Sequence, residues 1–466
     1  MGFHTSVARD SCREKNLEYT EVQRTLVYNF QLFKSFMKER IAIVCGFRSP
    51  MGKAGGVMKN ISAHDLGARV LKEILLRSKI DVQKIDEVII GNVAQPAEAA
   101  NIARVIALKA GIPEKVPAFT VHRNCASGME AFTTAISKIR GQESEIIVAG
   151  GVESMSNIPL LFNKKMTELF ANLARAKTFK QKFATILSFR PDFLTPIIGL
   201  VSGLTDPISG LIMGCTAENV ARDFNITRKD QDEFALKSHQ KAEAATANGI
   251  FKEEIIPVFN NDLKNSMMIE EDEGIRKGQT IENLTKLKPY FEKVTGTVTV
   301  GTSSQVTDGA AFAILMSESK AKELGYTPLG YIVDYAYAGL DPSRMGLGPV
   351  FAAQKLFTKT GFGLKDMELI EINEAFAAQV IGCQKAFASE EFCKKHFNIN
   401  QAIGEIDSTI LNVNGGGIAL GHPVGMSGTR IIIHLLRELK RRGKNRGLAS
   451  LCVGGGQGGA VIVEVN

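Results

Sequence analysis

A single cysteine stands where a helix is expected to begin, in the stretch VHRNCASGMEAF at residues 121–132. A thiolate is a strong nucleophile, and the positive end of a helix dipole lowers the pKa of a thiol placed there. Cys125 is therefore a candidate nucleophile. A lone cysteine is more often a small buried apolar residue, and this motif alone favours that structural role.

Three other stretches carry residues that could act with this thiol. NVNGGGIALGHPVGMSGTR places His422 in a glycine-rich loop ahead of a helix, EINEAFAAQ places Asn373 after a strand, and SLCVGGGQGG places Cys452 before several glycines. Each stretch alone is compatible with an ordinary turn or helix start. Together with the Cys125 stretch they predict a functional site.

The elements that must position these residues alternate between short apolar runs and helical patterns from Ile41 onward, which predicts an α/β fold. The predicted strands include IAIVCGF, EVIIGNV, EIIVAGG, GYIVDYAYAG and LASLCVGGG. Helices are expected at SAHDLGARVLKEILLRS, capped by Ser62, and at SGTRIIIHLLRELKRRG, ended by Gly443.

An internal repeat links two of these segments. ASGMEAFTTAISKIRGQESEIIVAGG, from Ala126, and MSGTRIIIHLLRELKRRGKNRGLASLCVGGG, from Met426, both read as Ser-Gly, helix, basic turn, strand and glycines. A duplicated α/β unit would bring both Ser-Gly helix starts to one central point, so that the two halves share a site.

Composition excludes several other classes of protein. The seven cysteines are scattered without a C-x-x-C pair, which indicates reduced thiols, and the seven histidines show no metal-binding spacing, so we predict no metal. A net charge of +7 favours anionic partners without selecting one, and we expect no nucleic acid as a partner.

The most apolar stretch, at 195–214, is broken by Pro196 and Asp206, which argues against a membrane span. Gly454, Gly456 and Gly459 match a dinucleotide-binding pattern, but a strand follows instead of the required helix.

Residues 1–36 form an N-terminal extension of uncertain role. Its acidic residues argue against a mitochondrial presequence, and Met37 is an alternative start for the protein.

At this point seven ordered motifs identify a resemblance to the thiolase family from Ile41 to Asn466. They are NCASGMEA, GGVESMS, MGCTAENVA, GTVTVGTSSQVTDGAA, NEAFAA, GHPVGMSGTR and CVGGGQG. The resemblance implies that Cys125 is the acylated nucleophile, that His422 activates it, and that Cys452 is the second acid/base. It also implies one oxyanion hole from the backbone N–H groups of Cys125 and Gly454, and a second from His422 with a water held by Asn373.

The resemblance places Met213, Ser304, Met345 and Phe376 around the pantetheine arm or the acyl chain, although apolar residues there could equally be core. Many acetoacetyl-type thiolases have a histidine before the Met-Gly pair, where this chain has Ile212. This difference weighs against a site specialised for acetoacetyl-CoA.

The fold implied by the resemblance is a five-layer α-β-α-β-α arrangement of two duplicated halves plus a loop domain. Residues 37–155 and 291–322 would form the N-terminal half, 156–290 the loop domain and 323–466 the C-terminal half. The implied reaction is CoA-dependent cleavage of 3-ketoacyl-CoA in fatty-acid β-oxidation, with CoA and acyl-CoA as substrates and no permanently bound cofactor. The alternatives are condensation of two acetyl-CoA to acetoacetyl-CoA, or a non-catalytic lipid-binding scaffold.

The segment at 160–200 departs from a simple thiolase. It has seven Lys or Arg residues against two acids, with apolar residues at helical spacing. A basic amphipathic hairpin can lie on an anionic membrane or dock a partner helix, and an ordinary helical pair covering the active site is equally compatible.

The 160–200 insert also resembles that of thiolase subunits in β-oxidation multienzyme complexes, which implies a hydratase/dehydrogenase partner. Those subunits usually have His-Glu where this chain has Asn373-Glu374. We expect a homodimer or homotetramer in a bacterial-type cytoplasm, with membrane association or a mitochondrial matrix location as alternatives.

Overall fold

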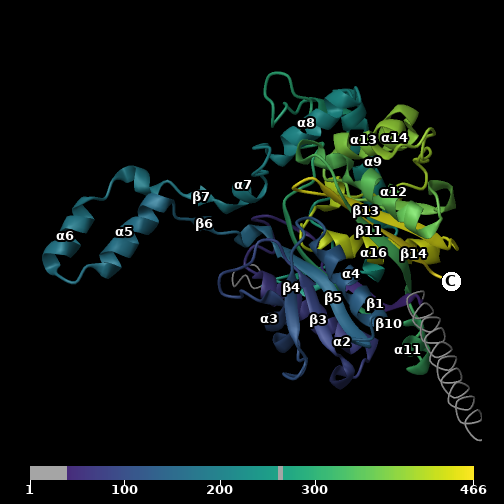
Figure 1. Cartoon of the computed structure of the whole chain (residues 1–466), viewed down its shortest axis with the longest axis horizontal. Helices are drawn as coiled ribbons and strands as arrows, with labels where there is room; N and C mark the ends of the chain where they lie inside the picture. Colours follow the sequence, from purple (N-terminus) through teal and green to yellow (C-terminus); the bar gives the residue numbers. More distant parts are fainter. Residues whose placement is uncertain (1–38, 261–265) are drawn as a thin grey trace, which may run out of the picture.

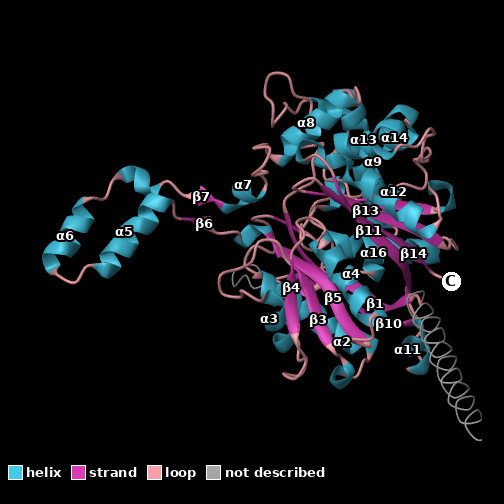
Figure 2. Cartoon of the chain, viewed as in Figure 1, coloured by secondary structure: helices cyan, strands magenta, loops and turns pink. Residues whose placement is uncertain are grey.

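The computed structural model describes residues 39–260 and 266–466. Its main sheet follows the strand order β12-β13-β14-β11-β1-β10-β5-β3-β4, with β2 paired to β10 (Figure 2). The strands are β1 (Ile41–Arg48), β2 (Gly52–Lys53), β3 (Glu87–Gly91), β4 (Ala118–Val121), β5 (Ile146–Ser154), β10 (Thr307–Ser317), β11 (Gly330–Gly339), β12 (Leu369–Ile372), β13 (Arg446–Val453) and β14 (Gln457–Glu464). All five strands predicted from apolar runs are therefore confirmed.

The sheet consists of two half-sheets with matching connectivity. In the first half the order β1-β10-β5-β3 has its counterpart β11-β14-β13-β12 in the second, and β1 pairs with β11 where the halves join. The first half lies below the second in Figure 1. The internal repeat thus corresponds to a duplicated α/β unit.

Helices complete five layers around these half-sheets. Helices α4 (Ser127–Arg140) and α16 (Ser427–Arg441) contact each other between the half-sheets, and α16 contacts strands of both; α2 (Ala63–Ser78) and α12 (Gly348–Thr360) pack on the outer faces. The remaining long helices are α3 (Ile102–Lys109), α8 (Met213–Asp223), α9 (Arg228–Ala247), α13 (Ala377–Ala388) and α14 (Glu390–Phe397). The expected α-β-α-β-α thiolase fold is therefore present.

Local sequence signals explain where several elements begin and end. The hydroxyl of Ser62 accepts a hydrogen bond from the Asp65 backbone N–H, which caps α2 as predicted. Strand β5 is buried along its whole length because helices cover both of its faces. Its apolar run is consequently continuous rather than alternating.

The two central helices cross through their Ser-Gly starts. A methyl group added at Gly128 would lie 2.6 Å from Thr429 Oγ1, and one at Gly428 would lie 2.5 Å from the Met129 backbone nitrogen. Only glycine permits such close approach of two backbones. This contact brings the loops before the two helices together, as the repeat predicted.

A buried ion network links β1 to the loop region and to α16. The Arg48 guanidinium contacts Asp272 at 2.7 Å and Glu254 at 2.7 Å, and Glu254 also contacts His434 at 2.9 Å. Every member is nearly inaccessible to solvent. Because each charge has partners, the network is tolerated in the core.

An arm at residues 158–200 projects away from the body in Figure 1. Two short paired strands, β6 (Leu160–Leu161) and β7 (Ile197–Ile198), form its stalk, and α5 (Lys164–Arg175) and α6 (Phe179–Leu187) form its helical hairpin. The predicted amphipathic helices are present. The alternative in which the pair covers the active site is wrong, because the arm extends outward.

The expectations for residues 1–36 and Met37 lie outside the described residues. The domain boundaries predicted above remain predictions. Within the two described ranges, the structure has no helix that is long and apolar enough to span a bilayer.

Candidate active site

Four loops or strand ends carry the predicted site residues. Cys125 lies in the turn between β4 and α4, and His422 lies between the short helix α15 (Gly417–Leu420) and α16. Asn373 directly follows β12, and Cys452 is near the end of β13. The contact between α4 and α16, and the parallel pairing of β12 with β13, bring these segments to the centre of the molecule.

The Cys125 turn is held against the glycine loop that follows Cys452. The Gly454 backbone N–H donates to the Cys125 sulfur, and the Asn124 side-chain amide donates to the Gly454 carbonyl at 2.7 Å. Asn124 adopts a φ of 43°, a conformation that asparagine tolerates better than most residues. Asn124 was not among the predicted site residues, although it lies within the NCASG motif.

Both thiols are more weakly acidic than an exposed cysteine. Burial raises the pKa of Cys125 despite the hydrogen bond from Gly454, and burial together with the nearby Cys125 raises the pKa of Cys452 further. The prediction that the helix dipole gives Cys125 a lowered pKa is therefore wrong, because desolvation of the thiolate has the larger effect and raises the pKa. The two sulfurs are close enough to influence each other's ionisation.

His422 and Asn373 form a buried pair. The Asn373 amide nitrogen lies 3.5 Å from Nδ1 and 3.4 Å from Nε2 of the imidazole. Burial, with Arg430 nearby, lowers the pKa of His422 to about 3, so the ring is neutral at physiological pH. The Asn373 Oδ1 atom is buried without a protein partner. An acceptor in this position fits a water molecule held beside the histidine.

Two buried glutamates hold these loops in place, and neither was among the predicted site residues. Glu153, in the GGVES motif, accepts backbone hydrogen bonds from Val93, Ala94 and Gly425. Burial raises its pKa to about 7. Glu153 thereby connects the first half to the loop that carries His422.

The second glutamate directly follows Asn373. Glu374 accepts hydrogen bonds from the Ser238 hydroxyl at 2.6 Å, the Asn412 amide at 2.9 Å and the Ile418 backbone N–H at 3.2 Å. These bonds fix the turn carrying Asn373 relative to the loop before His422. The only available sequence signal was the position of Glu374 inside NEAF.

Three of the predicted substrate-contacting residues share an apolar cluster with Cys452. Met345, in the 3-10 helix η5 (Pro342–Leu347), and Phe376 belong to the same buried apolar cluster as Cys452, and Met213 packs against that cluster. The Ser304 backbone N–H bonds to the carbonyl of Ala375 at 2.9 Å. The structure therefore brings these residues together, while their roles remain predictions.

The glycines after Cys452 differ in how strictly they are required. A methyl group at Gly454 would approach nothing closer than 3.5 Å, so close packing does not explain the glycine there. Gly456 has a φ of +75°, and a methyl group there would collide with the Leu340 carbonyl. The steric requirement for glycine therefore applies to Gly456.

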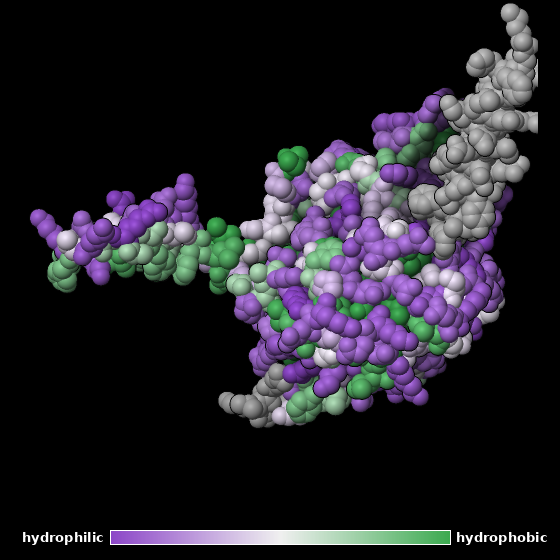
Figure 3. All heavy atoms as spheres, turned by 60° about the horizontal axis from the view of Figure 1, so that its bottom comes forward, coloured by the Kyte–Doolittle hydropathy of each residue, from purple (hydrophilic) through white to green (hydrophobic). Residues whose placement is uncertain are grey.

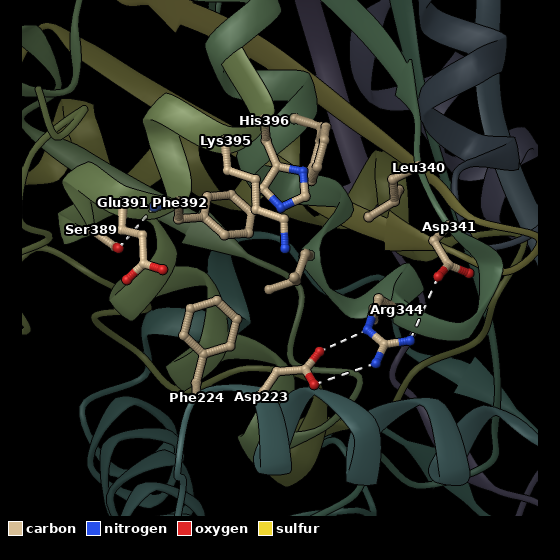
Figure 4. Close-up of a pocket in the computed structure, with 12 residues that line it drawn as sticks. Asp223, Phe224, Leu340, Asp341, Arg344, Ser389, Glu391, Phe392, Lys395 and His396 are labelled. Atoms are coloured by element: carbon tan, nitrogen blue, oxygen red, sulfur yellow. Dashed lines mark hydrogen bonds and ion pairs between the residues drawn. The ribbon is translucent and has the colours of Figure 1, made fainter. Parts of the chain in front are cut away.

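A cavity of about 830 Å³ opens beside this region without including either thiol (Figure 4). Its lining combines the rings of Phe224, Phe392 and His396 with the ion pair between Arg344 and Asp223 at 2.7 Å. Leu340 connects the cavity wall to the glycine loop after Cys452, since its backbone N–H bonds to the Gly456 carbonyl at 2.8 Å. The cavity borders the predicted site but is not part of it.

Among the described residues, no group of His, Cys, Asp and Glu is arranged to hold a metal ion. Comparison with known proteins gives two family matches. Residues 41–319 match "Thiolase, N-terminal domain" and residues 326–465 match "Thiolase, C-terminal domain". The chain belongs to the thiolase family.

Individual relatives resemble the chain along most of its length. A 3-ketoacyl-CoA thiolase of Shewanella loihica is 40% identical over 428 residues, covering 92% of this chain and 97% of the relative. An acetyl-CoA acetyltransferase of Rhizobium meliloti is 41% identical over 424 residues, covering 91% and 98%. A structure of human mitochondrial 3-ketoacyl-CoA thiolase in complex with CoA has a TM-score of 0.78 and 36% identity, covering 92% and 99%.

These findings establish the chain as a thiolase-type acyltransferase. The relative named 3-ketoacyl-CoA thiolase and the relative named acetyl-CoA acetyltransferase match it almost equally, with 40% and 41% identity. Overall identity therefore does not select a chain length or a direction of reaction.

Proposed function

We propose that this thiolase cleaves 3-ketoacyl-CoA with free CoA, giving acetyl-CoA and an acyl-CoA shortened by two carbons. The observations that carry the proposal are the half-buried Cys125 thiol, which lies close enough to the buried Cys452 thiol to raise its pKa, and the buried His422–Asn373 pair. Bond cleavage next to a ketone requires a nucleophile at the carbonyl and an acid for the departing enolate. Two thiols meet both requirements.

In the first half-reaction, His422 accepts the Cys125 proton as the sulfur attacks the 3-keto carbon. The bond between carbons 2 and 3 then breaks, and Cys452 donates its proton to the acetyl-CoA enolate. The raised pKa of Cys452 supports this assignment, because the thiol is protonated at neutral pH and ready to act as an acid.

In the second half-reaction, the Cys452 thiolate accepts the proton of incoming CoA, and the CoA sulfur bonds to the acyl carbon. The bond between that carbon and the Cys125 sulfur breaks, and the Cys125 sulfur takes its proton back from His422. We assign one oxyanion hole to the backbone N–H groups of Cys125 and Gly454, and the other to His422 with a water on Asn373. The unpartnered Asn373 Oδ1 supports the second assignment. Loss of one such donor typically raises the barrier by about 2.7–4 kcal/mol.

The test measures loss of 3-ketoacyl-CoA in the presence of CoA at several chain lengths. We expect Cys125→Ala and Cys452→Ala to abolish cleavage of long chains. Cys45→Ala is the matched control, since Cys45 is a free thiol in β1. Activity confined to acetoacetyl-CoA would instead support acetyl-CoA condensation, and absence of all acyl transfer would support a lipid-binding scaffold.

We propose that the arm at 158–200 makes a peripheral contact with an anionic membrane. Figure 3 shows its apolar residues gathered along one side and its hydrophilic residues along the other. Phe179 is 84% exposed and Leu187 is 69% exposed. Exposure of such large apolar side chains is costly in water, and basic residues near the surface each add about 1 kcal/mol on anionic lipid.

Co-sedimentation with vesicles tests this contact. The wild-type chain should bind phosphatidylserine vesicles more strongly than phosphatidylcholine vesicles, and a variant shortened between Leu160 and Ile198 should lose binding while keeping activity on short-chain substrate. Equal sedimentation of the wild-type chain and the shortened variant with phosphatidylserine vesicles would contradict the proposal. Formation of a complex only with an added hydratase/dehydrogenase would assign the arm to a partner subunit instead.

A homodimer or homotetramer in a bacterial-type cytoplasm remains our proposed assembly and location, with the mitochondrial matrix as the alternative. Light scattering on the purified chain measures its mass, and fractionation of native cells locates it.

A further inference from the structure

The His422 ring has a second buried partner besides Asn373. Its Nδ1 atom lies 2.6 Å from the hydroxyl oxygen of Ser427, in the first turn of α16. Ser427 is fully buried and His422 is 6% exposed. The hydroxyl also donates a hydrogen bond to the Pro423 carbonyl at 3.0 Å. A hydroxyl has one proton, so its direction decides which ring nitrogen of a neutral His422 is protonated.

The first half contains an equivalent serine, Ser127, and the direction of its hydrogen bonds is unambiguous. Ser127, in the first turn of α4, donates its hydroxyl proton to the Asn124 carbonyl at 2.7 Å and accepts the Arg123 backbone N–H at 2.9 Å. A backbone N–H can only donate, which fixes the proton direction at Ser127. Ser427 occupies the corresponding position in the second half. Its hydroxyl donates to the Pro423 carbonyl, as Ser127 donates to a carbonyl, and His422 Nδ1 lies where the Arg123 N–H group meets Ser127.

We propose that Ser427 is a positioning residue that holds His422 with its proton on Nδ1, which leaves Nε2 unprotonated and able to accept the Cys125 proton. The inference deepens the proposed function and rests on the role of His422 as base. When the Cys125 S–H bond breaks, its proton binds Nε2, the sulfur keeps the electron pair, and the Nδ1–H bond to Ser427 is unchanged.

A second buried histidine shows what a different partner would do. His434 Nδ1 lies 2.9 Å from a carboxylate oxygen of Glu254, and this contact raises the pKa of His434. A carboxylate in place of Ser427 would likewise stabilise the protonated ring, which cannot accept a proton. The neutral hydroxyl orients His422 without charging it.

Alkylation of Cys125 by iodoacetamide tests the proposal without requiring turnover. The rate is followed on the full chain by mass spectrometry of the peptide that contains Cys125, for wild type, Ser427→Ala, His422→Ala and the double variant. Loss of tautomer control in a catalytic triad reduces kcat about 10⁴-fold; because Ser427 is uncharged, we expect a slowing of about 10- to 100-fold in Ser427→Ala. The kcat for cleavage should fall similarly, with KM for CoA unchanged.

The double variant separates positioning from a general structural effect. Because Ser427 is proposed to act through His422, Ser427→Ala should slow alkylation in the wild-type background and have no further effect in His422→Ala. Ser49→Ala is the control: Ser49 is fully buried and its hydroxyl also donates to a proline carbonyl, that of Pro50 at 2.6 Å. We expect its alkylation rate and kcat to match wild type.

Two results would overturn the inference: wild-type alkylation in Ser427→Ala, or the same slowing by Ser427→Ala in both backgrounds. An unchanged rate in His422→Ala would refute the base itself, and the inference with it. Failure of the proposed function gives a different result, namely no cleavage of any 3-ketoacyl-CoA by the wild-type chain while the alkylation rates still show coupling between Ser427 and His422.

Discussion

The crossing of α4 and α16 at their glycines predicts that a single methyl group will reduce activity. In Gly128→Ala, the new Cβ would lie 2.6 Å from Thr429 Oγ1 and 2.8 Å from the Gly425 carbonyl oxygen. The threonine side chain can rotate, but the carbonyl belongs to the loop that carries His422. The Gly425 contact is about 0.6 Å shorter than the 3.4 Å at which ordinary packing begins, so the helices must separate by about that amount.

This separation has two measurable consequences. Overpacking of a core contact typically costs about 1–3 kcal/mol. With the usual entropy of unfolding per residue, a chain of 466 residues should lose about 1–3 °C in unfolding temperature. A displacement of 1 Å can reduce a rate about 100-fold, so we expect kcat for 3-ketoacyl-CoA cleavage to fall about 10- to 100-fold.

The assays are thermal unfolding by calorimetry and CoA-dependent loss of 3-ketoacyl-CoA. Gly203→Ala is the control, because a methyl group at Gly203 in helix α7 (Gly199–Gly203) meets nothing within 4 Å. It should retain wild-type activity and stability. Wild-type kcat in Gly128→Ala would show that the helix crossing does not set the distance between the Cys125 and His422 loops, and would refute the reasoning.

Three further predictions follow from the same structure. Because burial raises the pKa of Cys125, its alkylation rate should still increase with pH where an exposed thiol has reached its plateau; a plateau near neutral pH would contradict this. Gly454→Ala should fold like wild type in thermal unfolding, whereas Gly456→Ala should be destabilised by its positive φ and the collision with a carbonyl; equal unfolding temperatures would contradict this difference. Arg48→Met leaves the buried Asp272 carboxylate without its main partner and should lower the free energy of unfolding by about 3–5 kcal/mol in denaturant titration, and a loss below 1 kcal/mol would show that water replaces the arginine.

Local patterns in the sequence were sufficient for much of the fold. Continuous apolar runs predicted five buried strands, and the serine before α2 predicted a cap whose hydrogen bond the structure contains. These features depend on short-range chemistry, namely side-chain burial and the unpaired N–H groups of a first helical turn. The repeated Ser-Gly helix starts also predicted the meeting of the two halves.

Candidate residues for the site could be named from the sequence, but their pKa values could not. Cys125, His422, Asn373 and Cys452 could be named because each lies in a motif of characteristic composition. The direction of the Cys125 pKa could not be predicted, because it depends on a balance between a local dipole and desolvation by distant segments. The outward direction of the 158–200 arm could not be predicted either, since an amphipathic pattern does not specify what covers the apolar face.

The sequence by itself determined which residues are candidates for the chemistry and which secondary elements hold them. Only the tertiary structure decided that Ser427 contacts the His422 ring, that Glu153 connects the first half to the His422 loop, and that the strict steric need for glycine lies at Gly456 rather than Gly454. The physical reason is that hydrogen-bond direction, desolvation and steric overlap depend on distances of a few tenths of an ångström. Such distances arise from packing between the two halves and are not encoded in any single motif.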